Sequence, residues 1–133
     1  QDRRDLVRQC LDVGHERLVG ELEGSVDAWV ASGRPAAAIP VVGVDQLDGT
    51  VIDVRQANEF AAGHIPSAGN IELGSIPTAP MPSDRPLTVM CGHGERAMSA
   101  ASLLAARYVT ARVFDGGPDT WATATGQALE TGR

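Results

Sequence analysis

The stretch Leu87-Thr88-Val89-Met90-Cys91-Gly92-His93-Gly94-Glu95-Arg96 places a cysteine between an apolar run and an alanine-rich segment. The apolar run predicts a short buried strand, and residues 95–107 carry apolar side chains at helical spacing. A cysteine at a strand-to-helix turn lies where backbone N–H groups and the positive end of the helix converge. Both stabilise the thiolate, which is the nucleophilic form of the side chain. The stretch therefore predicts an α/β fold with a reactive sulfur at one turn.

The rest of the chain also alternates between short strands and helices. Apolar runs predict strands at 17–22, 41–44, 50–54, 70–73, 87–90 and 112–114, and helical spacing predicts helices at 2–14, 27–32, 56–62, 95–107 and 118–125. A proline-rich loop is expected at 74–86, and Trp29 and Trp121 are expected to anchor their helices in a core. This order predicts a three-layer α/β fold, with a central parallel sheet of about five strands and helices on both faces. The buried side of helix 95–107 is expected to hold Ala97, Ala100, Ala101, Leu104 and Tyr108.

Composition excludes several classes of function. The chain has 133 residues and a net charge of −6, so it lacks the basic surface that nucleic-acid binding requires. No apolar run approaches the roughly 20 residues of a membrane span, and no basic-then-apolar secretion signal is present. We therefore expect a cytoplasmic protein whose two cysteines stay reduced. Cys10 lies in a helical pattern and is expected to be a small buried hydrophobe.

An internal repeat divides the chain. Gly24–Trp29 resembles Gly116–Trp121 at an offset of 92 (116 − 24), and a helix, a strand and a turn precede the second helix in both copies. At this offset the counterpart of Cys91 falls just outside the chain. The repeat predicts that residues 1–40 are the C-terminal remnant of a preceding module plus a linker. Residues 41–133 are predicted to form a module that contains the cysteine loop.

Three groups of residues resemble the rhodanese superfamily of sulfurtransferases, in the same order along the chain. Residues 91–96 are similar to its C-x-x-G-x-R active loop, and Gly116-Gly117 with Trp121 to its C-terminal turn and helix. The resemblance implies a rhodanese-like fold over 41–133. Tandem modules of this kind follow a metallo-β-lactamase-like persulfide dioxygenase domain in bacterial fusions, which we expect as an upstream partner. The N-terminal signature of the family is matched by Ile52-Asp53-Val54-Arg55, Glu59-Phe60, Gly63-His64-Ile65-Pro66, Ala68 and Asn70-Ile71.

The resemblance implies that Cys91 is catalytic. Its thiolate would take sulfane sulfur from an anionic small-molecule donor, thiosulfate or a thiol persulfide, and pass it to a thiol or cyanide acceptor. Only four residues separate Cys91 from Arg96, one fewer than in related phosphatases, so the ring suits sulfur rather than phosphate. Two alternatives stay open: a non-catalytic sulfur-carrier or regulatory module of a larger fusion, and a phosphatase or arsenate reductase.

The residues that follow Cys91 are expected to bind the donor. Arg96 would orient its anionic group, while the small residues let backbone amides turn toward the sulfur. His93 either donates a hydrogen bond to the bound group or lies on the loop rim, and the Glu95 carboxylate is expected to point outward. The loop has no lysine or arginine before Arg96, which weakens thiosulfate as the donor relative to a persulfide. The predicted substrate-binding residues are Gly92, His93, Gly94, Glu95, Arg96 and Arg55.

Three further residues are expected to support the loop rather than to react. Asp53 and Glu59 would form ion pairs or hydrogen bonds, and His64 would be a hydrogen-bonded turn residue. Arg55 is expected to be the one member of its neighbourhood that touches substrate. The histidines and Cys10 lack the spacing of metal ligands, so we expect neither a metal nor an organic cofactor.

Overall fold

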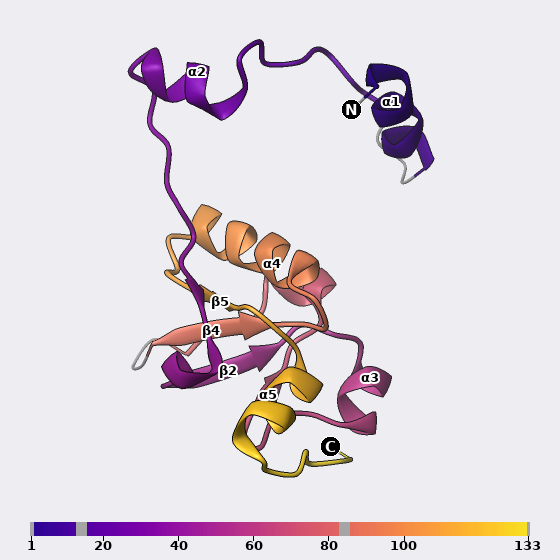
Figure 1. The fold of residues 1–133 in the computed structure, drawn as a ribbon, viewed down its shortest axis with the longest axis vertical. Coiled ribbons are helices and arrows are strands. Elements are labelled where there is room, and N and C mark those ends of the chain that lie inside the picture. Colours follow the sequence, from indigo (N-terminus) through magenta and orange to yellow (C-terminus); the bar gives the residue numbers. More distant parts are fainter. Residues whose placement is uncertain (1, 13–15, 83–85, 133) are drawn as a thin grey trace. The chain divides into compact units, whose positions relative to one another are not determined.

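The structure is a computed structural model that describes residues 2–12, 16–82 and 86–132. It divides into two compact units, Gln1–Ala37 and Ala38–Arg133. The larger unit contains the sheet and the cysteine loop (Figure 1). Its strands are β1 (Val41–Val42), β2 (Thr50–Asp53), β3 (Gly69–Asn70), β4 (Leu87–Met90) and β5 (Arg112–Phe114), and its helices are α3 (Ala57–Ala62), α4 (Glu95–Ala106) and α5 (Pro118–Thr125), with 3-10 helices η1 (Val44–Gln46) and η2 (Leu73–Ser75).

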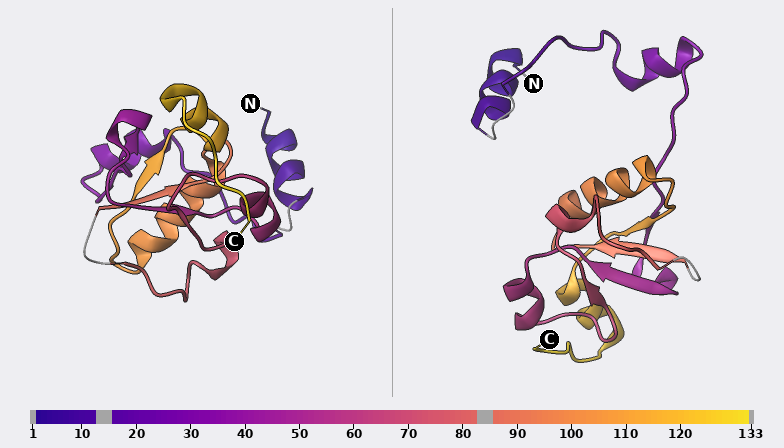
Figure 2. Two further views of the ribbon diagram at one scale, coloured as in Figure 1. Left: turned by 90° about the horizontal axis from the view of Figure 1, so that it is seen from below. Right: turned by 180° about the vertical axis from the view of Figure 1, so that it is seen from behind.

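The five strands form one sheet in the order β1-β5-β4-β2-β3, and every neighbouring pair is parallel. Helix α4 covers one face, and α3 and α5 lie on the other (Figure 1, Figure 2). The predicted three-layer α/β fold is therefore confirmed. All four residues of the central strand β4 are buried, because a strand covered by helices on both faces exposes neither side to water.

Two hydrophobic clusters hold the layers together. Val89 and Val113 pack beneath α4 in the first cluster, while Met90 and Phe114 pack with Trp121 of α5 in the second. Successive residues of a strand point to opposite faces, so adjacent residues of β4 and β5 supply both clusters. The position of Trp121 agrees with its expected role as a helix anchor.

Some predicted boundaries differ from the structure. The predicted strand 70–73 is reduced to β3 and followed by η2, and the predicted strand 41–44 is reduced to β1. Both are edge strands, which have only one neighbour to pair with. Tyr108 was expected on the buried side of α4 but is 99% exposed, because the helix ends at Ala106 and Tyr108 adopts a φ of 60°.

The smaller unit contains α1 (Arg3–Asp12) and α2 (Ser25–Ala31). The strand predicted at 17–22 is wrong: residues 16–22 have no strand structure, and no strand among the described residues pairs with them to complete their backbone hydrogen bonds. Neither helix has a buried residue, so Trp29 does not anchor a core. Its indole Nε1 donates to the Pro35 carbonyl (2.9 Å) and its ring lies 4.6 Å from the Arg34 guanidinium. The predicted helix end at Gly14 lies outside the described residues.

Candidate active site

Cys91 directly follows the central strand β4, and α4 begins four residues later. Its side chain is buried, with 1% exposed, and the backbone N–H of Gly94 donates to its Sγ at 3.1 Å. Gly94 is the N-cap of α4 and has a φ of 103°, a conformation that favours glycine. An N–H aimed at the sulfur and the positive end of α4 both stabilise negative charge on Sγ.

The turn between β5 and α5 lies close to the backbone carbonyls of the cysteine loop. A Cβ atom on Gly117 would lie 2.6 Å from the carbonyl oxygen of Gly92 and 3.1 Å from that of Cys91. These two carbonyls therefore point toward Gly117. In a trans peptide the N–H points opposite to the C=O, so the amides of Gly92 and His93 point away from the turn. Gly117 was not among the predicted site residues, although the Gly-Gly pair after β5 was the signal for it.

Arg96 is joined to α3 rather than free in the loop. Its Nη1 and Nη2 donate to the two carboxylate oxygens of Glu59 at 2.7 and 2.9 Å. Glu59 also accepts from the Gln56 N–H at the start of α3. The hydrogen bonds from Arg96 lower the pKa of Glu59 to about 2, and the same bonds raise the pKa of Arg96. Arg96 was expected to orient the donor, but two nitrogens of its guanidinium group donate to Glu59 instead.

Asp53 and Arg55 form a second, more deeply buried pair at the end of β2. Asp53 is fully buried and Arg55 has 12% of its side chain exposed. Arg55 Nη2 donates to Asp53 (2.7 Å) and to the Gly63 carbonyl (2.7 Å), and Arg55 Nε donates to both Asp53 oxygens. Asn70, which was not predicted as a site residue, donates to the Asp53 and Arg55 carbonyls. These contacts occupy Nε and Nη2 of the arginine expected to touch substrate.

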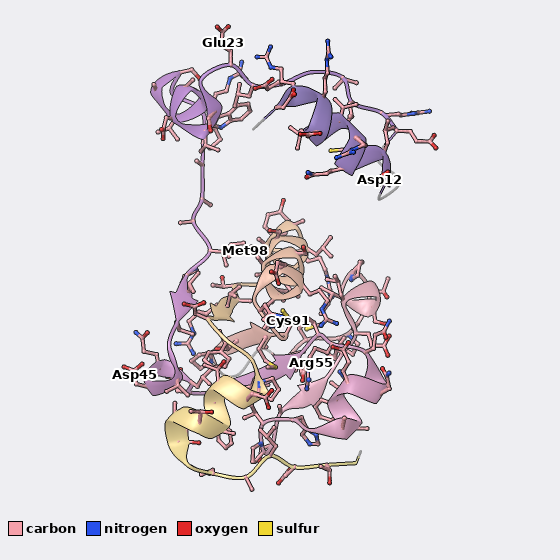
Figure 3. The ribbon with its side chains drawn as sticks, turned by 45° about the vertical axis from the view of Figure 1, so that its right-hand side comes forward. Asp12, Glu23, Asp45, Arg55, Cys91 and Met98 are labelled. Atoms are coloured by element: carbon pink, nitrogen blue, oxygen red, sulfur yellow. The ribbon has the colours of Figure 1, made fainter. Side chains whose placement is uncertain are left out.

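Cys91 and Arg55, two of the predicted residues, follow neighbouring parallel strands and so lie at the carboxyl-terminal ends of those strands. Cys91 follows β4 and Arg55 follows the neighbouring strand β2 (Figure 3). His93 and Glu95 are exposed on the loop. His64 is buried elsewhere in the unit: its ring stacks on Phe60 with centroids 3.7 Å apart, and its Nδ1 donates to the Phe60 carbonyl (2.9 Å). The geometry therefore separates the loop residues from His64.

Residues 2–12, 16–82 and 86–132, which the structure describes, contain neither a candidate metal site nor a candidate membrane span. Across these ranges, no three His, Cys, Asp or Glu side chains gather in a way that would hold a metal ion. Within the same described part of the chain, no helix is long and apolar enough to cross a bilayer. The chemistry that the described geometry offers is that of a buried cysteine sulfur that accepts a hydrogen bond from a backbone N–H.

Comparisons with known proteins agree with this geometry. The chain is 30% identical over 90 residues to thiosulfate sulfurtransferase GlpE of Pseudoalteromonas translucida, covering 65% of this chain and 86% of that one. It is 35% identical over 74 residues to the GlpE of Pseudomonas savastanoi pv. phaseolicola, covering 53% and 70%. A crystal structure of a rhodanese-related protein from Thermoplasma volcanium has the same fold, with a TM-score of 0.62 and 23% identity over 70% of this chain and 99% of that one. Residues 43–124 match the family model of the rhodanese-like domain, and the chain belongs to this family.

Proposed function

We propose that this protein is a sulfurtransferase that carries sulfane sulfur as a persulfide on Cys91. The observation that carries the proposal is the Cys91 sulfur itself: it is buried at the end of the central strand, accepts the Gly94 N–H and lies at the start of α4. The relatives named as thiosulfate sulfurtransferases support the same reaction class.

The proposed reaction has two displacement steps. With thiosulfate, the Cys91 thiolate attacks the outer sulfur, a new S–S bond forms, and the bond to the sulfonate sulfur breaks with release of sulfite. The electron pair of the broken bond leaves with sulfite, so the enzyme holds Cys91–S–S⁻. An acceptor thiolate or cyanide then attacks the outer sulfur, and its product leaves as Cys91 returns to the thiolate.

The neighbouring residues have proposed roles in these steps. The amides of Gly92, His93 and Gly94 would stabilise charge on the persulfide, since the Gly94 N–H already donates to the sulfur. Arg96 would fix the loop to α3 through Glu59. The short spacing of 91–96 favours sulfur over a phosphate or arsenate oxyanion. A cytoplasmic location would keep Cys91 reduced.

The organisation of residues 1–40 is a further part of the proposal. The order of helix, Gly24 turn and Trp29 helix supports a remnant of a preceding rhodanese-like module. We propose that this module belongs to a fusion with a metallo-β-lactamase-like domain. The nucleotide sequence upstream of the Gln1 codon tests this directly, and an unrelated coding sequence there would contradict it.

Substitution of Cys91 tests the proposed function, and the second cysteine supplies a matched control. Cys91→Ser should abolish both the gain of one sulfur atom by mass spectrometry and cyanide-dependent thiocyanate formation, because a hydroxyl cannot hold sulfane sulfur. Cys10→Ser should retain both, since Cys10 lies on α1 in the other unit. Thiocyanate formation by Cys91→Ser at the wild-type rate would refute the proposal. Loading of Cys91 without turnover would instead identify a carrier.

A further inference from the structure

A cavity of about 730 Å³ lies beside α3, and its lining residues come from outside the cysteine loop. They belong to α3, to β3 with the turn before it, and to the C-terminal segment, all within the larger unit. Its apolar wall is formed by Ala57, Phe60, Ala61 and Ala68. Small-molecule sites are cavities of this size, mostly apolar with a few polar groups that converge on the ligand.

The C-terminal segment forms one wall of this cavity and is attached through its backbone. Glu130 and His64 exchange two backbone hydrogen bonds of 2.9 and 3.0 Å, and the Gly132 N–H donates to the Ala61 carbonyl. Leu129 packs in the second hydrophobic cluster. The position of this wall therefore does not depend on the Glu130 side chain.

The ring of His64 is fixed in a way that leaves one nitrogen without a donor. Its side chain is 6% exposed, it stacks on Phe60, and its Nδ1 lies 2.9 Å from the Phe60 carbonyl oxygen. A carbonyl oxygen only accepts, so Nδ1 carries the proton and Nε2 of the neutral ring is an acceptor. Among the contacts of the described residues, Nε2 faces a Glu130 carboxylate oxygen at 3.7 Å, which is beyond hydrogen-bond distance and is a second acceptor. Burying an acceptor without a donor is costly, so a donor is expected between the two groups.

The other polar residues of the cavity mostly add acceptors. Asn70 Nδ2 donates to the Asp53 and Arg55 carbonyls, so the group that Asn70 has left is the acceptor Oδ1. The Glu130 carboxylate only accepts, and it adds a negative charge. Asn58 is exposed and has both a donor and an acceptor. The cavity therefore complements a ligand group that is rich in donors and positively charged.

We propose that this cavity binds a primary alkylammonium ion, whose N–H groups donate to His64 Nε2 and to the Glu130 carboxylate. An ammonium group has three donors and no acceptor, and its charge is opposite to that of Glu130. The alkyl chain would lie against Phe60 and the alanines of the apolar wall. The site lies outside the cysteine loop, so this inference does not depend on the proposed sulfurtransferase function.

A nuclear magnetic resonance titration of the full chain measures this binding, with the backbone amide signals as the readout. The probe is butylammonium at about pH 8, where alkylamines keep their proton and histidine rings are generally neutral. Butyltrimethylammonium keeps the charge without an N–H donor, and butanol has a donor without the charge. We expect butylammonium to shift the amides of 57–70 and 129–132 saturably. Each control probe should bind about tenfold more weakly, as the loss of one charge-assisted hydrogen bond implies.

Two variants test the named acceptors. Glu130→Gln removes the charge, and His64→Asn keeps a donor for the Phe60 carbonyl but lacks Nε2. Each should weaken butylammonium binding about tenfold. Asp115→Asn is the matched control for Glu130→Gln. It removes one exposed carboxylate charge at the end of β5, three strands or roughly 14 Å from β3, and should leave the affinity unchanged.

Three results overturn the inference: no saturable shift of the amides around the cavity, equal binding of butyltrimethylammonium and butylammonium, or equal effects of Glu130→Gln and Asp115→Asn. Thermal unfolding of each variant is measured alongside. If His64→Asn is unfolded at the working temperature, the comparison of Glu130→Gln with Asp115→Asn decides the outcome, because the wall that carries Glu130 is held by its backbone.

Discussion

Two arginine–carboxylate pairs lie at the same edge of the sheet but differ in burial and reach. Asp53 and Arg55 are two residues apart, with side chains 0% and 12% exposed. Glu59 and Arg96 are 37 residues apart, with side chains 35% and 39% exposed. The first pair is contained within the end of β2, whereas the second joins α3 to α4 beside Cys91. The same chemical pair therefore serves two different purposes.

Burial determines what each pair contributes. Removing one partner of a buried pair leaves an uncompensated charge away from water and costs about 3–5 kcal/mol. An exposed pair is screened by solvent and contributes about 0–1 kcal/mol. We infer that Asp53–Arg55 holds the end of β2 in place, while Glu59–Arg96 sets the position and charge of the loop with little effect on stability.

The largest expected effect comes from breaking the buried pair. Asp53→Asn should lower the free energy of unfolding by about 3–5 kcal/mol, because Arg55 keeps its charge and loses its carboxylate. Denaturant unfolding followed by circular dichroism measures this change. Asp115→Asn is the matched control: it is exposed at the end of β5 and should shift stability by less than about 0.5 kcal/mol. A smaller loss for Asp53→Asn than for Asp115→Asn would contradict the assignment.

The effect of the loop backbone on Cys91 can be tested by substituting Gly117, which leaves both arginine–carboxylate pairs in place. Gly117→Ala should cost about 1–3 kcal/mol, because its Cβ meets the Gly92 carbonyl at 2.6 Å. It should also slow alkylation of Cys91 by iodoacetamide at a temperature where the protein stays folded, and change the pH profile of that reaction. Both effects follow from a shift of the loop amides around the sulfur.

Gly49→Ala is the matched control for this substitution. Its Cβ would lie 2.3 Å from the Pro86 carbonyl, and Gly49 has a φ of 78°, so it should destabilise at least as much. Gly49 precedes β2 at the opposite edge of the sheet from Cys91, so the alkylation profile should match wild type. If the two variants alter Cys91 reactivity equally, Gly117 has no specific role in positioning the loop.

The sequence predicted the parts of this edge that depend on local pattern. The apolar run of β4, the glycines after Cys91 and the alanine spacing of α4 are short-range signals, and these elements form where they were predicted. The partner of Arg96 was not predictable in this way. Glu59 was assigned a supporting ion pair, but nothing in the spacing showed that its partner would be the arginine expected to bind the donor.

The helices α1 and α2 show more clearly what a sequence pattern cannot predict. At the offset of 92 that aligns the two Gly-Trp turns, the buried Ala97 and Ala100 of α4 correspond to Asp5 and Arg8 of α1. Although the two regions have their elements in a similar order, α1 lacks the apolar face with which α4 packs. A strand forms by pairing with a neighbouring strand. β5 pairs with β4, whereas no strand in the described part of the chain pairs with the segment 17–22.

The smallest expected effect is the pH dependence of the exposed pair. The pKa of Glu59 is lowered to about 2 by Arg96, below the ordinary glutamate value. A lowered folded-state pKa contributes stability that is fully present above the unfolded value of about 4.3 and is lost as pH falls through the folded value. Glu59→Gln removes this contribution at every pH. The difference in unfolding free energy between wild type and Glu59→Gln should therefore be at most about 1 kcal/mol near neutral pH, because the pair is over a third exposed, and should shrink between about pH 4.3 and 2.

Thermal unfolding of wild type and Glu59→Gln across this pH range measures the contribution of Glu59, because the two proteins have all other carboxylates in common. Glu95→Gln is the control, since Glu95 is exposed and has no ion pair among the described contacts.

The same Glu59→Gln protein should load thiosulfate faster than wild type, because the freed Arg96 adds positive charge beside Cys91. A difference of 3 kcal/mol or more, on the scale of about 3–5 kcal/mol for a buried pair, would show that Glu59–Arg96 supports the fold as Asp53–Arg55 does. The contrast between the two pairs would then not hold.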